Sequence, residues 1–198
     1  MPIAQYKHLA ARNYAMVVLA AESGLRADEL IHLEISNDLF FESKKLQTRF
    51  AKGTNGSGKR ARVTLFTPFA RDTIKFYLKN HRPKITNADS TDYLFISRTG
   101  ATLTYTSIQR FLSKQMIPLA KKHGFPVMDH LSWHWFRRIF ATRFIERYPD
   151  KIHVLISLIG HTTDATIHAY IRHSAPWMDK HILEMLEGIP LDGHSMES

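Results

Sequence analysis

The sequence contains no cysteine among its 198 residues. This absence excludes a disulfide framework and a thiolate metal site, and it is compatible with a reducing compartment. No apolar run approaches the roughly 18 residues that a membrane-crossing helix needs, and the first residues lack the apolar core of a signal peptide. We therefore expect a cytoplasmic protein that has no membrane association.

Linkers and several common catalytic motifs are also missing. No Gly/Ser/Pro-rich stretch divides the chain, which predicts one domain long enough to bury a real core. The chain has 12 histidines, but HExxH is absent and no Asp or Glu completes a ligand set at zinc-like spacing, so we expect no metal. A G-x-S-x-G elbow is absent too, which argues against acyl transfer by a serine.

Acidic residues are absent from one long basic stretch. Residues 43–71 include eight Lys and Arg and no Asp or Glu, and the formal net charge of the chain is +9. A polyanion such as DNA is therefore a candidate partner, although many basic proteins bind no nucleic acid. The residues of this stretch that we predict to contact DNA are Lys44, Lys45, Arg49, Lys59, Arg60 and Arg62.

The same stretch has the pattern of a small sheet. LFFE, KLQTRFAK and RARVTLF predict three short antiparallel strands, with turns at residues 43–44 and 54–58. GTNGSGKR nearly matches a P-loop, but Arg60 stands where a hydroxyl must ligate magnesium, and the residues after it favour a strand over a helix. A basic hairpin that lies against a phosphate backbone is the better interpretation.

Most of the remaining chain has helical periodicity, so the expected fold class is α+β, mainly α-helical, with this three-stranded sheet. Helices are predicted over 5–22, just after residue 26, and over 67–80, 104–123, 131–144 and 152–159. YLFIS is predicted to be a buried strand or extended segment. The apolar stripes expected to be buried are Ile108, Phe111, Leu112, Met116 and Leu119 in one helix, and Leu131, Trp135, Phe136, Ile139, Phe140 and Phe144 in another.

The stretch from residue 129 to 173 contains the first hint of a phosphate site. His134 and Arg137 are three residues apart, so they can lie on one helical face and reach the same small anion. Gly160 suits a left-handed helix cap and is followed by His161 in a tight turn. Tyr170 lies nine residues beyond His161, near the end of a further predicted helix.

Arg26 and Glu29 are a second pair, at the start of the short helix that follows the turn at residues 23–24. Taken alone, they are more simply interpreted as a surface ion pair worth about 0.3–0.5 kcal/mol.

Combined, these groups make chemical sense if the substrate is a phosphodiester. Attack by the Tyr170 oxygen would build negative charge on two non-bridging oxygens, and Arg26, Arg137, His134 and His161 could stabilise that charge without a metal. The leaving 5′-oxygen needs a proton, which a lysine on the hairpin could supply.

The sequence resembles the tyrosine recombinase (phage integrase) family over essentially the whole of that family's catalytic domain. SGLRADEL, AKGTNGSGKRARVTLF, SWHWFRRIFAT and LIGHTTDATIHAYIRH are similar to its four motifs. The resemblance implies a 3′-phosphotyrosyl bond, release of a 5′-hydroxyl, and strand exchange between double-stranded DNAs by a tetramer, without a cofactor. The implied catalytic residues are Arg26, Lys52, His134, Arg137, His161 and the nucleophile Tyr170, with Glu29 as a supporting acid.

Two departures from the family pattern are Trp135 and Arg138, which replace a smaller residue and a histidine. The family's amino-terminal DNA-clamping domain has no counterpart here, so we expect either an excised catalytic domain or a short relative. Residues 1–175 are the expected catalytic domain, and residues 176–198 a helix and tail that dock on a neighbouring protomer or pack on their own core. The apolar stripe of that helix is Met178, Ile182, Met185, Leu186 and Ile189.

Several alternatives stay open at this point. The chain could be a DNA-binding module without strand transfer, or an enzyme like the type IB topoisomerases that uses the same chemistry. Lys59 competes with Lys52 as the general acid. The target sequence, the choice between integration, excision, transposition and resolution, and the oligomeric state without DNA do not follow from the sequence.

Overall fold

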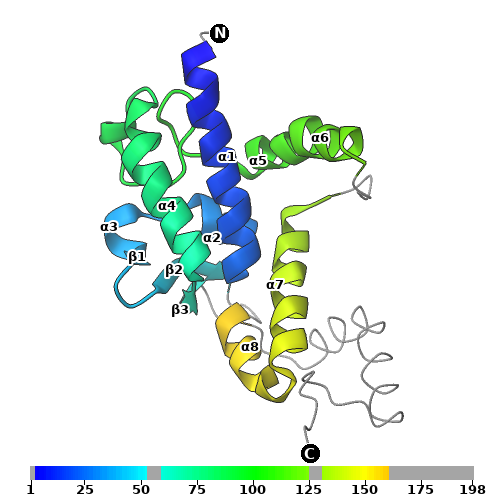
Figure 1. Cartoon of the computed structure of the whole chain (residues 1–198). Coiled ribbons are helices and arrows are strands. Elements are labelled where there is room, and N and C mark those ends of the chain that lie inside the picture. The colour runs from blue at the N-terminus through cyan, green and yellow to red at the C-terminus, as the bar shows by residue number, and fades with distance from the viewer. Residues whose placement is uncertain (1–2, 53–58, 125–130, 161–198) are drawn as a thin grey trace, which may run out of the picture.

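The computed structural model describes residues 3–52, 59–124 and 131–160. Within them, most elements are helices and a small antiparallel sheet lies at one side of the molecule, which is the α+β, mainly helical class predicted (Figure 1). The helices are α1 (Ile3–Ser23), α2 (Ala27–Ile31), α3 (Ile35–Asp38), α4 (Pro68–Asn80), α5 (Tyr105–Phe111), α6 (Ile117–Lys122), α7 (Trp133–Arg147) and α8 (Ile152–Ile159), and the strands are β1 (Leu39–Phe40), β2 (Lys45–Lys52) and β3 (Lys59–Leu65). Short 3₁₀ turns cover Arg82–Lys84, Ala88–Ser90 and Pro149–Lys151.

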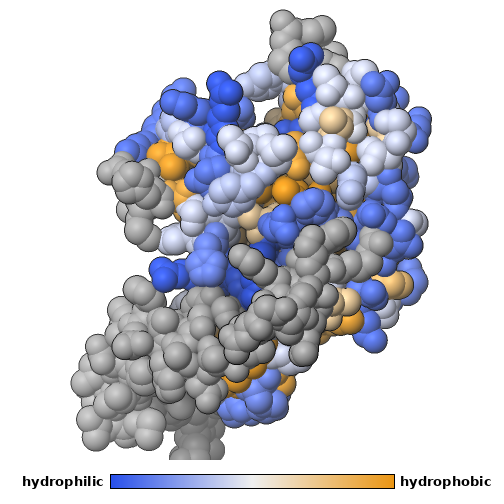
Figure 2. Space-filling model, turned by 180° about the vertical axis from the view of Figure 1, so that it is seen from behind, coloured by the Kyte–Doolittle hydropathy of each residue, from blue (hydrophilic) through white to orange (hydrophobic). Residues whose placement is uncertain are grey.

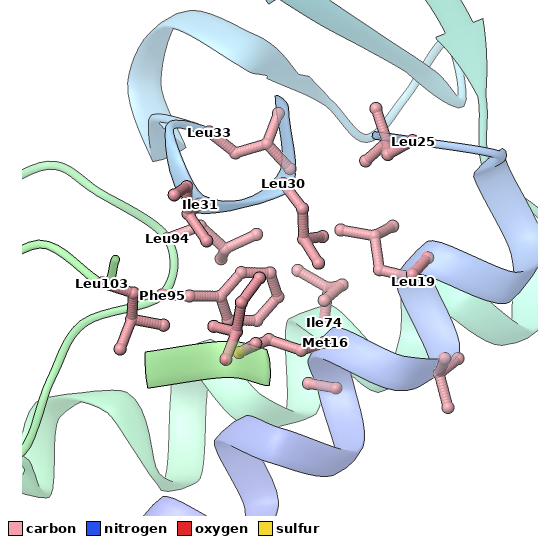
Figure 3. Packing of buried hydrophobic residues seen from close by; sticks show 14 of the residues in the cluster. Met16, Leu19, Leu25, Leu30, Ile31, Leu33, Ile74, Leu94, Phe95 and Leu103 are labelled. Atoms are coloured by element: carbon pink, nitrogen blue, oxygen red, sulfur yellow. The ribbon is translucent and has the colours of Figure 1, made fainter. Parts of the chain in front are cut away.

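The main core lies where α1, α2 and α4 meet the segment that precedes α5. In Figure 3, side chains of α1 and α2 point toward Ile74 of α4 and toward Phe95. Leu94, Phe95 and Ile96 are buried, as predicted for YLFIS, but Leu94 and Phe95 form a bend and not a strand. Isolated bridges pair Glu34 with Tyr93 and Ile96 with Thr102. This packing fixes α2, and with it the turn that carries Arg26, against the long helix α1.

The sheet has the predicted strands in the order β1-β2-β3, with both neighbouring pairs antiparallel. Lys44 has a φ of 55° in the tight turn before β2, close to the predicted position of that turn. The ladder between β2 and β3 runs from Lys45 opposite Leu65 to Lys52 opposite Lys59, with an irregularity between Thr48 and Ala51. The hydroxyl of the buried Thr64 donates to the carbonyl of Ser23 at 2.9 Å, which ties β3 to the end of α1.

The predicted helix over 104–123 is interrupted by a π-helical turn at Leu112–Met116. The π-turn has more residues per turn than an α-helix, so it rotates the face that α6 presents relative to α5. Leu119 is therefore 59% exposed, and the prediction that it is buried was wrong. Ile108 and Leu112, which lie before this rotation or at its start, are buried as predicted.

Helix α7 follows the predicted burial at Leu131, just before it, and at Phe136, but not at Trp135. Trp135 is 36% exposed, whereas Trp133 and the charged Arg137 are fully buried. The prediction for Trp135 was wrong because it assigned the buried face by apolarity, while this helix places an arginine inside. None of the helices in the described residues combines the length and apolarity needed to cross a membrane.

Gly24 joins α1 to α2 with a φ of 65°, in the left-handed region that favours glycine. A Cβ at this position would meet the ring of Phe140, on α7, at 2.5 Å. The Gly24→Ala variant should therefore lose about 1–2 kcal/mol through backbone strain and a further 1–3 kcal/mol or so through overpacking. Denaturant unfolding of the wild type and the variant measures the difference.

Gly124→Ala is the matched control. Gly124 has a φ of 74°, but a Cβ there would have nothing within 4 Å, so only the backbone strain should be measured. Equal losses in the two variants would show that Phe140 moves aside freely and that the contact between α1 and α7 is loose.

Candidate functional site

The site begins at the N-terminus of α2, where Arg26 is the N-cap residue. The Glu29 carboxylate accepts from the Arg26 backbone N–H at 2.7 Å and from its Nη1 at 3.1 Å. The Glu29 side chain is only 1% exposed, whereas that of Arg26 is 27% exposed. The surface-pair interpretation is therefore wrong, because Glu29 is a buried anion that holds a partly accessible guanidinium.

Arg62 of β3 is the second partner of this carboxylate. Its Nε donates to Oε1 of Glu29 at 3.0 Å and its Nη2 to Oε2 at 2.5 Å, and the Arg62 side chain is 9% exposed. Burial alone would raise the pKa of Glu29, but the hydrogen bonds and charge of Arg62, together with those of Arg26, lower it overall. Arg62 had been predicted to contact DNA. Its guanidinium is instead engaged inside the protein.

Three arginines from distant segments bind the last three carbonyls of the α8 terminus. Arg62 Nη1 donates to Leu158, Arg137 Nη2 donates to Ile159, and Arg26 Nη2 donates to Gly160 at 3.3 Å. Gly160 has a φ of 61° and caps α8 as predicted. Carbonyls at a helix C-terminus lack intrahelical partners and carry partial negative charge, so cationic donors satisfy them well.

Arg137 reaches this helix end from the interior of α7. Its side chain is fully buried, and its Nη1 also donates to the carbonyl of Gly24 at 2.7 Å. Arg137 therefore connects the end of α8 to the turn between α1 and α2. The predicted proximity of Arg26 and Arg137 is present, since both contact the same two-residue stretch of backbone.

His134 lies one turn before Arg137 on α7 but is exposed. Partial burial of its ring, followed by the positive charges of Arg137, Arg138 and Arg26, lowers the pKa of His134 from 6.5. The imidazole is therefore neutral at pH 7 and keeps one N–H donor.

Several predicted residues lie outside what the structure describes. His161 and Tyr170 fall in residues 161–198, and the side chains of Lys52 and Lys59 are not described. The backbone places these two lysines opposite each other at the end of the β2–β3 ladder, so register does not distinguish between them. The same limit applies to the side chains of Arg49 and Arg60.

The predicted DNA contacts of the basic stretch do not all lie together. Lys44 and Lys45 are exposed at the start of β2, whereas Lys52 ends that strand. At about 3.3 Å per residue, the two ends of β2 are roughly 23 Å apart. The molecular face in Figure 2 is largely hydrophilic, with hydrophobic residues visible between the charged and polar ones.

The inward direction of Arg62 could have been predicted from strand alternation. Arg62 and Thr64 lie on one face of β3, and Thr64 is buried, as is Phe66 just after the strand. Val63 and Leu65 face outward and are exposed. Because Val63 and Leu65 are apolar, the sequence suggested that their face of β3 is buried and that Arg62 faces solvent.

The described part of the site is suited to an anion and not to a metal. Within residues 3–52, 59–124 and 131–160, no group of three His, Asp or Glu side chains is placed to hold a metal ion. Arg26, with the neutral His134 nearby, instead offers N–H donors next to a buried network that fixes the guanidinium.

The buried carboxylate makes stability depend on pH. A lowered folded-state pKa means that Glu29 stabilises the fold fully above its ordinary value of 4.5 and loses this contribution as the pH falls through the folded-state value. Glu29→Gln should therefore lower the free energy of unfolding by about 3–5 kcal/mol at pH 7. The difference from wild type should shrink below pH 4.5, as measured by denaturant unfolding across that range.

Glu22→Gln is the control, because Glu22 pairs with the exposed Arg143 at 2.8 Å. An exposed pair of this kind contributes at most about 1 kcal/mol. A Glu29→Gln loss no larger than the Glu22→Gln loss would show that the buried network contributes little.

Comparison of the sequence with known proteins identifies the family of this chain. The phage integrase family model matches residues 1–176. The chain is 29% identical over 163 residues to tyrosine recombinase XerC of Natranaerobius thermophilus, covering 80% of this chain and 50% of that protein. It is also 29% identical over 176 residues to tyrosine recombinase XerA of Pyrococcus horikoshii, covering 89% and 54%. The chain thus spans about half the length of these curated relatives.

Solved structures agree on the fold. A crystal structure of XerA recombinase aligns with a TM-score of 0.71 and 24% identity, covering 93% of this chain and 64% of that one. A Tn1549 transposon integrase in complex with transposon right end DNA aligns with a TM-score of 0.69 and 19% identity, covering 94% and 64%. The family model spans most of the sequence, and the chain belongs to the phage integrase family.

Proposed function

We propose that this chain is the catalytic part of a site-specific recombinase that cleaves and rejoins double-stranded DNA through a 3′-phosphotyrosyl bond. The observation that carries the proposal is the convergence of Arg26 and Arg137 on the end of α8, from which the sequence continues directly into His161. Family membership supports the same chemistry.

In the proposed mechanism, the Tyr170 oxygen attacks the scissile phosphorus and gives its proton to an adjacent imidazole, and the bond to the 5′-oxygen breaks as that oxygen takes a proton from Lys52. Negative charge then grows on the non-bridging oxygens, where guanidinium and imidazole donors stabilise it. Removal of one such donor typically slows a reaction about a hundred- to a thousandfold. Of the two proposed catalytic arginines, Arg137 is fully buried and Arg26 has a side chain that is 27% exposed, so Arg26 is the one that can donate to a phosphate without a rearrangement.

The buried position of Arg137 adds a requirement to the mechanism. Its Nη atoms donate to the carbonyls of Gly24 and Ile159, and its side chain is fully buried. For Arg137 to reach a phosphate, its hydrogen bonds to Gly24 and Ile159 must break and the end of α8 must shift when DNA binds. The proposal therefore includes a local rearrangement of this helix end on the enzyme–DNA complex.

A covalent trap tests the nucleophile. The probe is a pool of 5′-labelled duplexes with a randomised segment and a nick just 3′ of it, incubated with protein in chelator. Loss of the short fragment beyond the nick should leave the label joined to the wild-type protein, and denaturing gels detect the adduct. Tyr170→Phe should form no adduct, because its ring has no oxygen to attack phosphorus.

Substitution of each of the other six tyrosines by phenylalanine serves as the control and should leave the adduct in place. Lys52→Ala and Lys59→Ala, assayed side by side, identify the general acid as the variant with the larger loss of rate. Salt-sensitive binding without an adduct from the wild type would favour a DNA-binding module and defeat the proposal. Relaxation of supercoiled DNA without joining of two partners would favour a topoisomerase-like enzyme.

We also propose that residues 176–198 dock on a neighbouring protomer when the protein assembles as a tetramer on DNA. Their apolar stripe needs an apolar surface, and the described part of the chain offers a groove of about 650 Å³ between α1, α4 and α7. Its aromatic lining is Phe140, Phe144 and Tyr148, and its charged lining is the Glu22–Arg143 pair with Glu146 and Arg147.

Leu186→Glu should abolish that assembly, because a buried carboxylate opposes docking. Sedimentation of the protein on duplex recovered from the covalent pool should then show smaller complexes than for wild type, while adduct formation persists. Leu186→Met, which stays apolar, should behave like wild type. Unchanged complexes with Leu186→Glu would mean that the segment packs on its own core.

A further inference from the structure

We propose that Arg62 is a positioning residue for the cleavage reaction, a role distinct from contacting DNA. Arg62 fixes Arg26 through Glu29, and it fixes the end of α8 through the carbonyl of Leu158. The inference rests on the proposed function, because it concerns the rate of that cleavage step.

The first link runs from Arg62 to Arg26 through four hydrogen bonds on one carboxylate. Oε1 of Glu29 accepts from Arg62 Nε and Arg26 Nη1, and Oε2 accepts from Arg62 Nη2 and the Arg26 backbone N–H. Each carboxylate oxygen is thus shared between the two arginines. Without Arg62, the buried anion has only Arg26 as its described ion-pair partner, and the guanidinium of Arg26 should be drawn away from a phosphate.

The second link runs from Arg62 to the backbone just before His161. Arg62 Nη1 donates to the carbonyl of Leu158, two residues before the left-handed Gly160. A Cβ on Gly160 would lie 2.7 Å from Cδ of Arg62, so the arginine stem passes directly against this turn. Loss of the Arg62 side chain would remove both the contact with Gly160 and the hydrogen bond to Leu158. The end of α8, from which the chain continues into His161 and Tyr170, would then be held less tightly.

The burial of Arg62 separates this role from a phosphate contact. Its side chain is 9% exposed, and all three of its guanidinium nitrogens donate to groups of the protein. A phosphate-binding arginine contributes to affinity and to the salt dependence of binding. A positioning residue instead changes the rate of the bound complex, because it acts on the alignment of the catalytic groups.

The test compares Arg62→Met and Arg62→Lys with Arg82→Met in the full chain. Arg82 is the matched control, since it is another buried arginine whose donors hold backbone carbonyls, those of Thr91 and Tyr93. The assay uses duplex recovered from the covalent pool and measures adduct formation in a single turnover at saturating DNA. Affinity and its salt dependence are measured on the same samples well below the melting temperature, which is determined separately by thermal unfolding.

For Arg62→Met we expect a rate at least about tenfold below wild type, as for a misplaced catalytic donor. Its affinity and salt slope should stay near wild type. Arg62→Lys should recover part of the rate, because a lysine keeps the charge but not the two-pronged contact with Glu29. Arg82→Met should lose melting temperature but keep its rate within about twofold of wild type.

Two results would overturn the inference while leaving the proposed function intact. One is a loss of rate in Arg82→Met equal to that in Arg62→Met, which would make Arg62 merely structural. The other is weaker binding with a shallower salt slope and an unchanged rate at saturation, the signature of a phosphate contact. If Arg62→Met does not fold, Arg62→Lys against Arg82→Met decides in the same way. A wild type that forms no adduct overturns the proposed function, and this inference with it.

Discussion

A carboxylate buried between two guanidinium groups is the constraint on which the rest of this site depends. Glu29 is placed in the interior by the short helix α2, and an ion there is tolerated only with close partners. Arg26 and Arg62 provide them, from the start of α2 and from β3 respectively. The position of the sheet relative to α2 is thereby coupled to the position of the arginine that faces solvent.

Much of the fold could be predicted because its local signals agree with its packing. The strand pattern, the helix predicted over residues 67–80 and the left-handed Gly160 all match the elements observed. The part of the site that could be predicted rests on short-range spacing. Arg26 and Glu29 are separated by one helical turn, and so are His134 and Arg137, so each pair could be recognised within its own helix.

The network that joins these pairs could not be predicted, because it depends on contacts between distant segments and on backbone acceptors. Arg62 resembled a surface charge, since its neighbours Val63 and Leu65 are the apolar residues of β3. Arg137 is buried on the face of α7 where an apolar residue would be expected. Both arginines donate to backbone carbonyls of α8. Every residue has such a carbonyl, so the sequence does not show which ones will accept a hydrogen bond from a distant arginine.

The order of the three arginines along the chain has a consequence for how the protein acquires its site. Arg26, Arg62 and Arg137 lie on segments separated by tens of residues, yet they meet on adjacent peptide groups. Contacts of such long sequence separation form only after loops between them have closed. No partial fold can hold the arrangement, and a nascent chain emerging from the ribosome would lack it until α8 had been synthesised.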